Sequence, residues 1–281
     1  MAEQLEQRTV RPFGPIASSV VEYLVAHSGQ VSIMDFPIRL YIVAQTIMIS
    51  KIEQENSHGP VIELEKVSKR YGREAEVFSD VSLTLAHKSF TFLTGASGAG
   101  KSTLLKLLQL SLQPSRGLIR LFGEDVLQLS QKDRQKLKRR IGVVSQDFGL
   151  IKHMNVFENA CLPLIAAGQS ISKNSDDVKE LLSWVGLGEK LHVLPPTLSG
   201  GEAQRLAIAR AVVNKPDILL ADEPTGNVDP EMGQKLLRLF QEMNRTGTTV
   251  LIATHDAQLV KSLKADSFRI IDGTLKKGSI L

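Results

Sequence analysis

The chain has 281 residues, of which 42% are hydrophobic and 23% charged, and its formal net charge at pH 7 is +4. This length allows one large domain or two small ones, and the mild positive charge permits anionic ligands without requiring them. One cysteine, Cys161, and the lack of an apolar run of about 18 residues exclude an internal disulfide and a transmembrane helix. We therefore expect a soluble, cytoplasmic protein that reaches a membrane only through a partner.

Residues 1–60 differ from the rest because they carry no nucleotide-binding motif and end in a polar linker, residues 53–60. We interpret them as an N-terminal extension, and two explanations stay open. Residues 41–49 have the pattern of a short amphipathic helix. Alternatively, the true start is internal, at Met48, and the preceding residues are poorly ordered or belong to a gene-model extension.

From Val61 the pattern becomes regular, with strand-like stretches at 61–67, 81–85 and 90–94. The next residues fit G-x-x-x-x-G-K-[ST], the P-loop pattern, and a helix-like stretch follows them. In such a loop the backbone N–H groups surround phosphate oxygens, the lysine reaches the β- and γ-phosphates, and the serine hydroxyl binds Mg²⁺. The predicted ATP-binding residues are Gly95, Ala96, Ser97, Gly98, Ala99, Gly100, Lys101, Ser102 and Thr103, with Ser102 also predicted as a metal ligand.

Two further features near the P-loop each have two interpretations. Tyr71 lies thirty positions before Lys101, where its ring could stack on adenine or simply pack in a turn, and we predict the adenine contact. The basic helix predicted at 131–140 could bind nucleic acid or anionic lipid, but such runs are usually solvated helix faces. We adopt the solvated interpretation and expect no nucleic acid partner.

A buried-type strand at 141–145 ends at Gln146, whose amide oxygen could bind Mg²⁺ or the attacking water. We predict a catalytic and a metal-binding role for Gln146. The segment that follows is mostly helical in pattern, with helices at 156–167 and 176–185, and Pro195-Pro196 ends it.

A second glycine-containing helix start comes at Ser199-Gly200-Gly201, followed by a predicted helix over 202–213. A helix N-terminus binds anions, so this is a second phosphate-binding candidate in a chain with one P-loop. If two subunits face head to tail, each supplies this element to the other's nucleotide. The pattern therefore predicts a C₂ homodimer with two ATP molecules, in which Ser199, Gly200, Gly201 and Glu202 act in trans.

An apolar strand over 218–223 ends in the carboxylates of Asp222 and Glu223. Because these carboxylates are expected next to the P-loop, we predict that Asp222 belongs to the coordination shell of Mg²⁺ and that Glu223 is the general base for the attacking water. A solvated acidic turn is the less favoured alternative after such an apolar run.

The remaining candidates are Asp229, in a loop expected to reach across the dimer interface, and His255, at the end of a buried strand over 248–254. A lone histidine at a strand end is more often structural. Here it follows a putative parallel strand, as the other candidates do, and we predict that it binds the γ-phosphate and orients the water.

Together these motifs resemble the ATP-binding cassette family over roughly residues 61–281. The resemblance implies an α/β fold, a P-loop cassette with a mostly parallel sheet core, an antiparallel β subdomain and a helical subdomain at 147–197. It also implies an ATPase that converts ATP and water to ADP and phosphate, with ATP and Mg²⁺ as ligands.

Within that family, the stretches 209–216, 221–229 and 239–249 are similar to the FtsE family of cell-division ATPases, as is Glu202. The resemblance implies an FtsX-like integral membrane partner, contact with other division proteins, and a place on the cytoplasmic face of the bacterial inner membrane. Ser145 and Ala203 depart from the usual residues, which leaves partner specificity open.

Three alternatives are kept. An ATPase subunit of a lipoprotein or drug exporter of the MacB/LolD kind would have the same ATP site. A DNA-repair ATPase would need a long insert before the second motif, but only about fifty residues separate Gln146 from Leu198. An ATP-dependent scaffold with little turnover would keep all these residues.

Overall fold

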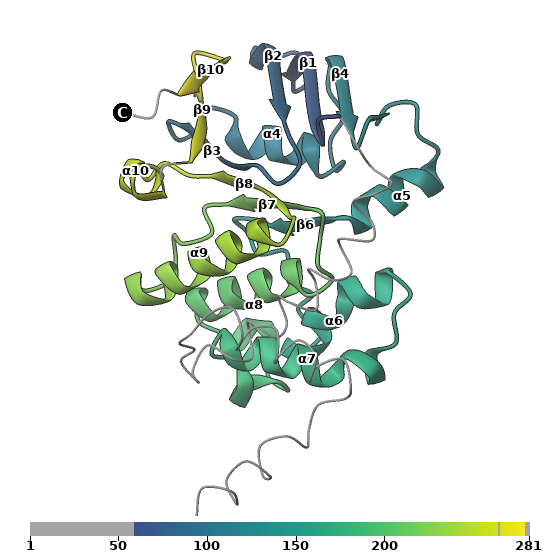
Figure 1. The fold of residues 1–281 in the computed structure, drawn as a ribbon, viewed down its shortest axis with the longest axis vertical. Coiled ribbons are helices and arrows are strands. Elements are labelled where there is room, and N and C mark those ends of the chain that lie inside the picture. Colours follow the sequence, from purple (N-terminus) through teal and green to yellow (C-terminus); the bar gives the residue numbers. More distant parts are fainter. Residues whose placement is uncertain (1–58, 264, 279–281) are drawn as a thin grey trace, which may run out of the picture. The chain divides into compact units, whose positions relative to one another are not determined.

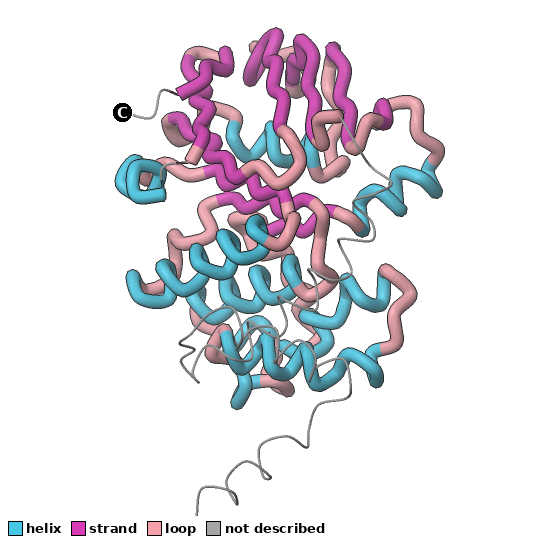
Figure 2. Tube along the Cα trace, in the orientation of Figure 1, coloured by secondary structure: helices cyan, strands magenta, loops and turns pink. Residues whose placement is uncertain are grey.

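The computed structural model describes residues 59–263 and 265–278, and the helix expected at 41–49 lies outside the described residues. The chain there forms two sheets and a set of helices (Figures 1 and 2). None of the helices in this part of the chain combines the length and the apolar character needed to cross a membrane.

The central sheet has six strands in the order β10-β9-β3-β8-β7-β6. All neighbours are parallel except β10 and β9. Every residue of β7 and β8 is buried, as expected for central strands of a parallel sheet covered on both faces. The strand bounds are β3 Phe90–Gly95, β6 Ile141–Val144, β7 Ile218–Asp222, β8 Thr249–Ala253, β9 Asp266–Ile271 and β10 Thr274–Gly278.

The second sheet is antiparallel, in the order β2-β1-β4-β5. Its strands are β1 Ile62–Arg70, β2 Glu76–Leu85, β4 Arg116–Leu121 and β5 Glu124–Asp125. The helix α4, Lys101–Leu108, lies between this sheet and the central one (Figure 1). One hydrophobic core joins the three elements, with Ile62 from β1, Leu104 from α4 and Leu220 from β7 among its members.

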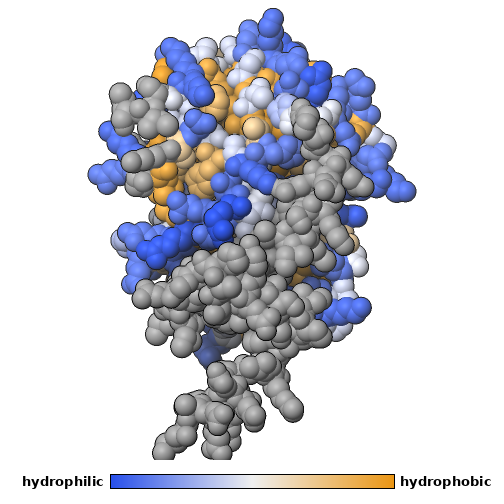
Figure 3. All heavy atoms as spheres, in the orientation of Figure 1, coloured by the Kyte–Doolittle hydropathy of each residue, from blue (hydrophilic) through white to orange (hydrophobic). Residues whose placement is uncertain are grey.

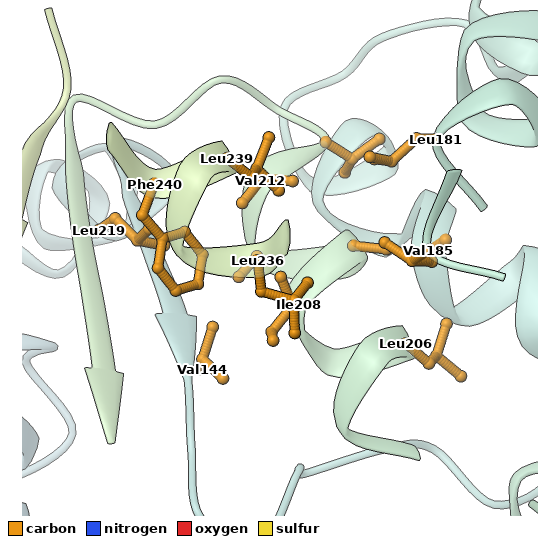
Figure 4. Close-up of a cluster of buried hydrophobic side chains, with 14 of the residues drawn as sticks. Val144, Leu181, Val185, Leu206, Ile208, Val212, Leu219, Leu236, Leu239 and Phe240 are labelled. Carbon is orange, nitrogen blue, oxygen red and sulfur yellow. The ribbon is translucent and has the colours of Figure 1, made fainter. Parts of the chain in front are cut away.

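The opposite face of the central sheet is covered by helices. Alternate residues of β7 point to opposite faces, so Leu219 joins this second core whereas Leu220 joins the first. Figure 4 shows Phe240 of α9 next to Leu219 and Val144 of the sheet, with side chains of α8 and Leu181 of α7 in the same cluster. The helix bounds are α6 Val156–Ala166, α7 Ile171–Trp184, α8 Gly200–Val212 and α9 Pro230–Arg245.

The remaining helices are short and lie toward the outside of the fold (Figure 1): α5, Gln131–Arg139, and α10, Ala257–Leu263. Two 3₁₀ turns, Gly188–Lys190 and Pro195–Thr197, connect α7 to α8. The outer face of α9 is mostly hydrophilic in Figure 3, while its inner face buries Leu236 and Phe240. This amphipathic pattern explains why α9 lies on the core with one face exposed.

Two helices begin earlier than the sequence predicted. α7 begins at Ile171 rather than near 176. Its first residues, 172–176, are polar and give no hydrophobic pattern from which a helix could be predicted. α8 begins at Gly200 rather than Glu202, because Ser199 and Glu202 form a capping box that stabilises the first turn despite its glycines.

Candidate nucleotide site

Five parallel strands end at the same edge of the central sheet, and the candidate residues lie at the ends of four of them, β3, β6, β7 and β8. A cavity of about 580 Å³ opens at this edge. The sequence predicted all its lining residues except Val77: the cavity is lined by Val77, Ser97, Gly98, Gly100, Lys101, Ser102, Thr103, Gln146, Asp222, Glu223 and His255. The arrangement agrees with the general rule that ligands bind beyond the carboxyl ends of parallel strands.

The P-loop connects β3 to α4 in a conformation that depends on glycine. Gly100 precedes α4 with φ of 101°, and a Cβ atom there would lie 2.9 Å from Cγ1 of Val77. The Lys101 ammonium donates hydrogen bonds to the main-chain oxygens of Gly95 and Ala96 at 2.8 and 3.1 Å. The side-chain cation and the N-terminus of α4 thus lie at one loop, an arrangement that can bind a polyphosphate.

Three oxygen donors of different type line the cavity together: the Ser102 hydroxyl, the Gln146 amide and the Asp222 carboxylate. Asp222 is 7% exposed at the end of β7. Burial raises the pKa of its carboxyl, and a hydrogen bond from Ser102 acts in the opposite direction. Oxygen ligands with one buried carboxylate fit Mg²⁺, because a divalent cation would offset the desolvation of that carboxylate.

Glu223 follows directly after β7 and adopts a left-handed backbone conformation, with φ of 48°. Its Oε1 atom accepts a hydrogen bond from the His255 main-chain N–H at 3.0 Å and lies 2.6 Å from His255 Nδ1. Its Oε2 atom accepts a hydrogen bond from Thr254 Oγ1 at 3.1 Å. The carboxylate is therefore held at the cavity by groups that follow β8, and its chemistry allows it to take a proton from a water molecule.

Thr254 is a site residue that the sequence analysis missed. Thr254 is 1% exposed and directly follows β8, so in the sequence it is indistinguishable from a buried residue of that strand. Its contact with Glu223 joins residues 31 positions apart, and no local pattern signals such a pair.

The second glycine-containing helix start, residues 199–202, does not contribute to the described lining of the cavity. Ser199 Oγ accepts a hydrogen bond from the Glu202 N–H at 3.3 Å, and Glu202 Oε2 accepts one from the Ser199 N–H at 2.9 Å. The other carboxylate oxygen of Glu202 lies 2.6 Å from the ammonium of Lys190. Within one chain, the start of α8 is thus a well-capped element that lies outside the lining of the cavity.

The Lys190 contact is the leading cause that lowers the pKa of the Glu202 carboxyl from 4.5 to about 2. A carboxyl whose pKa is lower in the folded than in the unfolded chain stabilises the fold at any pH above its unfolded-state pKa. That contribution is lost as the pH falls from the unfolded-state pKa to the folded-state pKa. We therefore expect Lys190→Met to destabilise the chain at pH 7, and the deficit to shrink as the pH falls from 4.5 toward 2. Urea unfolding of wild type and variant across that range measures this, and a deficit that does not change with pH would contradict the assignment.

Two other predicted residues, Tyr71 and Asp229, do not line the cavity. The Tyr71 ring is 41% exposed, and its hydroxyl lies 3.4 Å from Thr103 Oγ1 at the P-loop. Asp229 is the N-cap of α9, where its carboxylate accepts a hydrogen bond from the Met232 N–H at 2.9 Å. The sequence did not predict this capping role, although aspartate followed by proline is a common way to begin a helix.

Comparison with known proteins places this geometry in a family. Residues 78–226 match the ABC transporter family. The cell-division ATP-binding protein FtsE of Escherichia coli strain K12 is 44% identical over 218 residues, which cover 78% of this chain and 98% of that protein.

Solved structures agree with the sequence comparison. A dimeric structure of a bacterial ABC transporter cassette superimposes with a TM-score of 0.74 at 32% identity, covering 78% of this chain and 99% of that chain. A dimeric post-hydrolysis state bound to ADP and Pi gives 0.73 at 31% identity, with the same two coverages. The predicted cassette fold and ATPase activity are confirmed by these matches. The chain belongs to the ABC transporter family and is an ATPase of that family that resembles FtsE.

Proposed function

We propose that this ATPase is the nucleotide-binding subunit of a cell-division complex. Two copies bind two ATP molecules between them, and their closure acts on an FtsX-like membrane protein that controls cell-wall hydrolysis. Two observations support this proposal. The P-loop, Gln146, Asp222, Glu223 and His255 line one cavity, and the chain is 44% identical to FtsE of Escherichia coli. This function places the protein at the cytoplasmic face of the bacterial inner membrane.

The proposed cassette spans residues 61–281, and residues 147–197 form its helical subdomain. This division is supported by the packing of α6 and α7, both within 147–197, against each other. The match to FtsE of Escherichia coli, which covers 98% of that protein but 78% of this chain, is consistent with an additional N-terminal extension in residues 1–60.

Nucleotide binding in this proposal is mostly the work of the P-loop. The N–H groups of residues 95–103 and the Lys101 ammonium bind the phosphates, while Ser102, Gln146 and Asp222 hold Mg²⁺. When bound, the magnesium ion neutralises phosphate charge. Tyr71, which is 41% exposed and lies beside Thr103, would stack on adenine, with the Lys69 ammonium 5.3 Å from the centre of its ring.

Glu223 is the proposed general base. It takes a proton from the water that attacks the γ-phosphate, and Thr254 and His255 fix its two carboxylate oxygens. The His255 side chain is 75% exposed, so its ring is free to turn from Glu223 toward the γ-phosphate and orient the water.

The dimer is needed because the start of α8 lies outside the cavity of its own chain. The first N–H groups of a helix have no partner within the helix, so those of Gly200 and Gly201 are available to a phosphate. Ser199 and Glu202 complete this trans element, and Asp229 lies at the dimer interface. Two dimeric structures of one related cassette support this arrangement.

The proposed docking site for the membrane partner is an apolar groove of about 420 Å³ on α6 and its neighbours. Ile165 and Ile171, which are 49% and 37% exposed, lie on this groove and suit an apolar helix face of an FtsX-like protein. The full lining is His153, Met154, Phe157, Glu158, Cys161, Ile165 and Ile171. Cys161 acts here as a small apolar residue, as burial raises the pKa of its thiol.

Residues 147–154, which are held in place by side-chain hydrogen bonds, connect this groove to the nucleotide cavity. The Arg210 guanidinium donates to the main-chain oxygens of Phe148 and Gly149, just after Gln146. The buried Asn159 amide donates to the main-chain oxygens of Ile151 and Met154 and accepts from the Ile151 N–H. A movement of Gln146 with the nucleotide would therefore be carried to the groove.

Affinity capture tests this proposal. The full chain carrying Glu223→Gln, with ATP and Mg²⁺, should retain an FtsX-like protein from detergent-solubilised membranes. In that background Ile165→Lys should abolish capture, whereas Leu127→Lys, a change at an apolar residue with 43% exposure outside the groove, should preserve it. Recovery of an exporter permease would replace the division role by export, and equal capture by both variants would refute the groove.

A further inference from the structure

Gln204 has a buried side-chain amide whose nitrogen and oxygen both make hydrogen bonds. It lies on the second turn of α8 and is 2% exposed. Its Nε2 atom donates a hydrogen bond to the main-chain oxygen of Glu223 at 2.9 Å. Its Oε1 atom accepts a hydrogen bond from the main-chain N–H of Asn227, also at 2.9 Å. The sequence analysis assigned no role to this residue.

The main-chain position of Glu223 needs such support. Glu223 is the first residue beyond β7 and has φ of 48°, a region that residues with a side chain adopt rarely. Residues in sparsely populated backbone regions persist only where the surrounding structure holds them. Thr254 and His255 hold the Glu223 carboxylate. Its main-chain oxygen accepts the hydrogen bond from Gln204 at 2.9 Å and a longer one from the Gly226 N–H at 3.2 Å.

The same contacts join Glu223 to the start of α8. Gly201 packs so closely on the Asn227 carbonyl that a Cβ atom there would lie 2.8 Å from its oxygen. Asn227 thus contacts α8 at both Gly201 and Gln204, three residues apart on the same helix. The start of α8, the turn 223–227 and the main chain of Glu223 therefore form one connected unit.

We infer that Gln204 is a positioning residue that sets the place of Glu223 and ties it to the start of α8. The inference rests on the proposed function, in which the start of α8 contacts the partner's nucleotide while Glu223 acts on the nucleotide of its own chain. Gln204 then couples the two nucleotide sites of the dimer, because a shift of α8 at one site moves the base at the other.

The test compares two substitutions that each remove a bridging amide. Gln204→Met keeps the side-chain length and removes both hydrogen bonds. Asn244→Leu removes an amide that bonds the main-chain oxygens of Ser89 and Thr248, at the opposite end of β3 and β8. ATP hydrolysis by the full chain is measured against ATP concentration to give kcat, KM and the Hill coefficient.

For Gln204→Met we expect kcat to fall by about tenfold or more, because a small misplacement of a catalytic group is costly. KM should stay within about twofold, since the P-loop is untouched, and the Hill coefficient should fall toward about 1 because the sites uncouple. Asn244→Leu should keep both kcat and the Hill coefficient. If the kcat of Gln204→Met equals that of Asn244→Leu, the inference is wrong.

Gln204→Glu supplies a rescue that a purely structural role would not produce. Its carboxylate can accept from the Asn227 N–H, but it regains a donor for the Glu223 oxygen only when protonated. Relative to wild type, its kcat should rise as the pH is lowered from about 8 to about 6, since burial favours the neutral carboxyl. A constant ratio across this range would contradict the role of the donor.

Glu223→Gln, measured in the same assay, separates this inference from the proposed function. If Glu223→Gln hydrolyses ATP at the wild-type rate, the proposed base is wrong and the role of Gln204 fails with it. If Glu223→Gln is inactive while Gln204→Met matches the Asn244→Leu control, only the inference about Gln204 fails.

Discussion

The Glu223→Gln variant is expected to lose on the order of 10²-fold or more in ATP hydrolysis while it still binds ATP. Glutamine keeps the size of the side chain, and its single oxygen can still accept the hydrogen bond from the His255 main-chain N–H. Its NH₂ group then faces the Thr254 hydroxyl, which can act as the acceptor instead. It cannot take a proton from water. Phosphate release at saturating ATP, together with equilibrium ATP binding, separates the lost step from the retained one.

Glu242→Gln is the matched control for this change. Glu242 is 41% exposed near the end of α9, and its carboxylate pairs with Arg245 on the surface. The same loss of charge there should leave hydrolysis within about twofold, since surface ion pairs contribute little. A Glu223→Gln protein that hydrolyses ATP as fast as the Glu242→Gln control would show that Glu223 is not the base.

The Gly200→Asp variant is expected to fold and bind ATP normally, yet to lose ATP-driven dimerisation and about 10²-fold in hydrolysis. A Cβ atom at Gly200 would meet nothing within 4 Å in its own chain. An aspartate in the first turn of α8 also suits the helix dipole, so the isolated chain should not lose stability. In the proposed dimer, however, the carboxylate would face the phosphates of the partner's nucleotide.

Gln131→Asp provides the corresponding control, because it places the same side chain at the first residue of α5, away from the cavity. Thermal unfolding, ATP affinity and sedimentation with ATP in the Glu223→Gln background distinguish the two variants. Dimerisation of Gly200→Asp that equals the Gln131→Asp control would mean that the start of α8 does not meet a nucleotide in trans.

The parts of the site that are continuous in sequence were predictable. The P-loop residues are consecutive, and their types follow from the need for positive φ at Gly100 and a cation at Lys101. Asp222 and His255 were predicted because each lies at the carboxyl end of a buried strand, and parallel strands bring these ends to one edge. Local pattern and one topological rule were enough for these positions.

Contacts between distant residues were not predictable in this way. The Lys190–Glu202 pair and the Gln204 bridge join a helix to a turn or loop, and their partners are set by how α8 packs on its neighbours. In the fold, the first residues of α7 were missed because Ser172 and Asn174 have low helix propensity. In the structure the Asn174 side-chain amide donates a hydrogen bond to the main-chain oxygen of Ser170 at the start of this helix.

The most direct test of the central account is the mass and nucleotide content of the full-length Glu223→Gln protein in solution with ATP and Mg²⁺. The account predicts a dimer that retains one ATP per chain and reverts to monomers when ADP replaces ATP. A protein that binds ATP but stays monomeric at every concentration, or a dimer that forms equally without nucleotide, would contradict it.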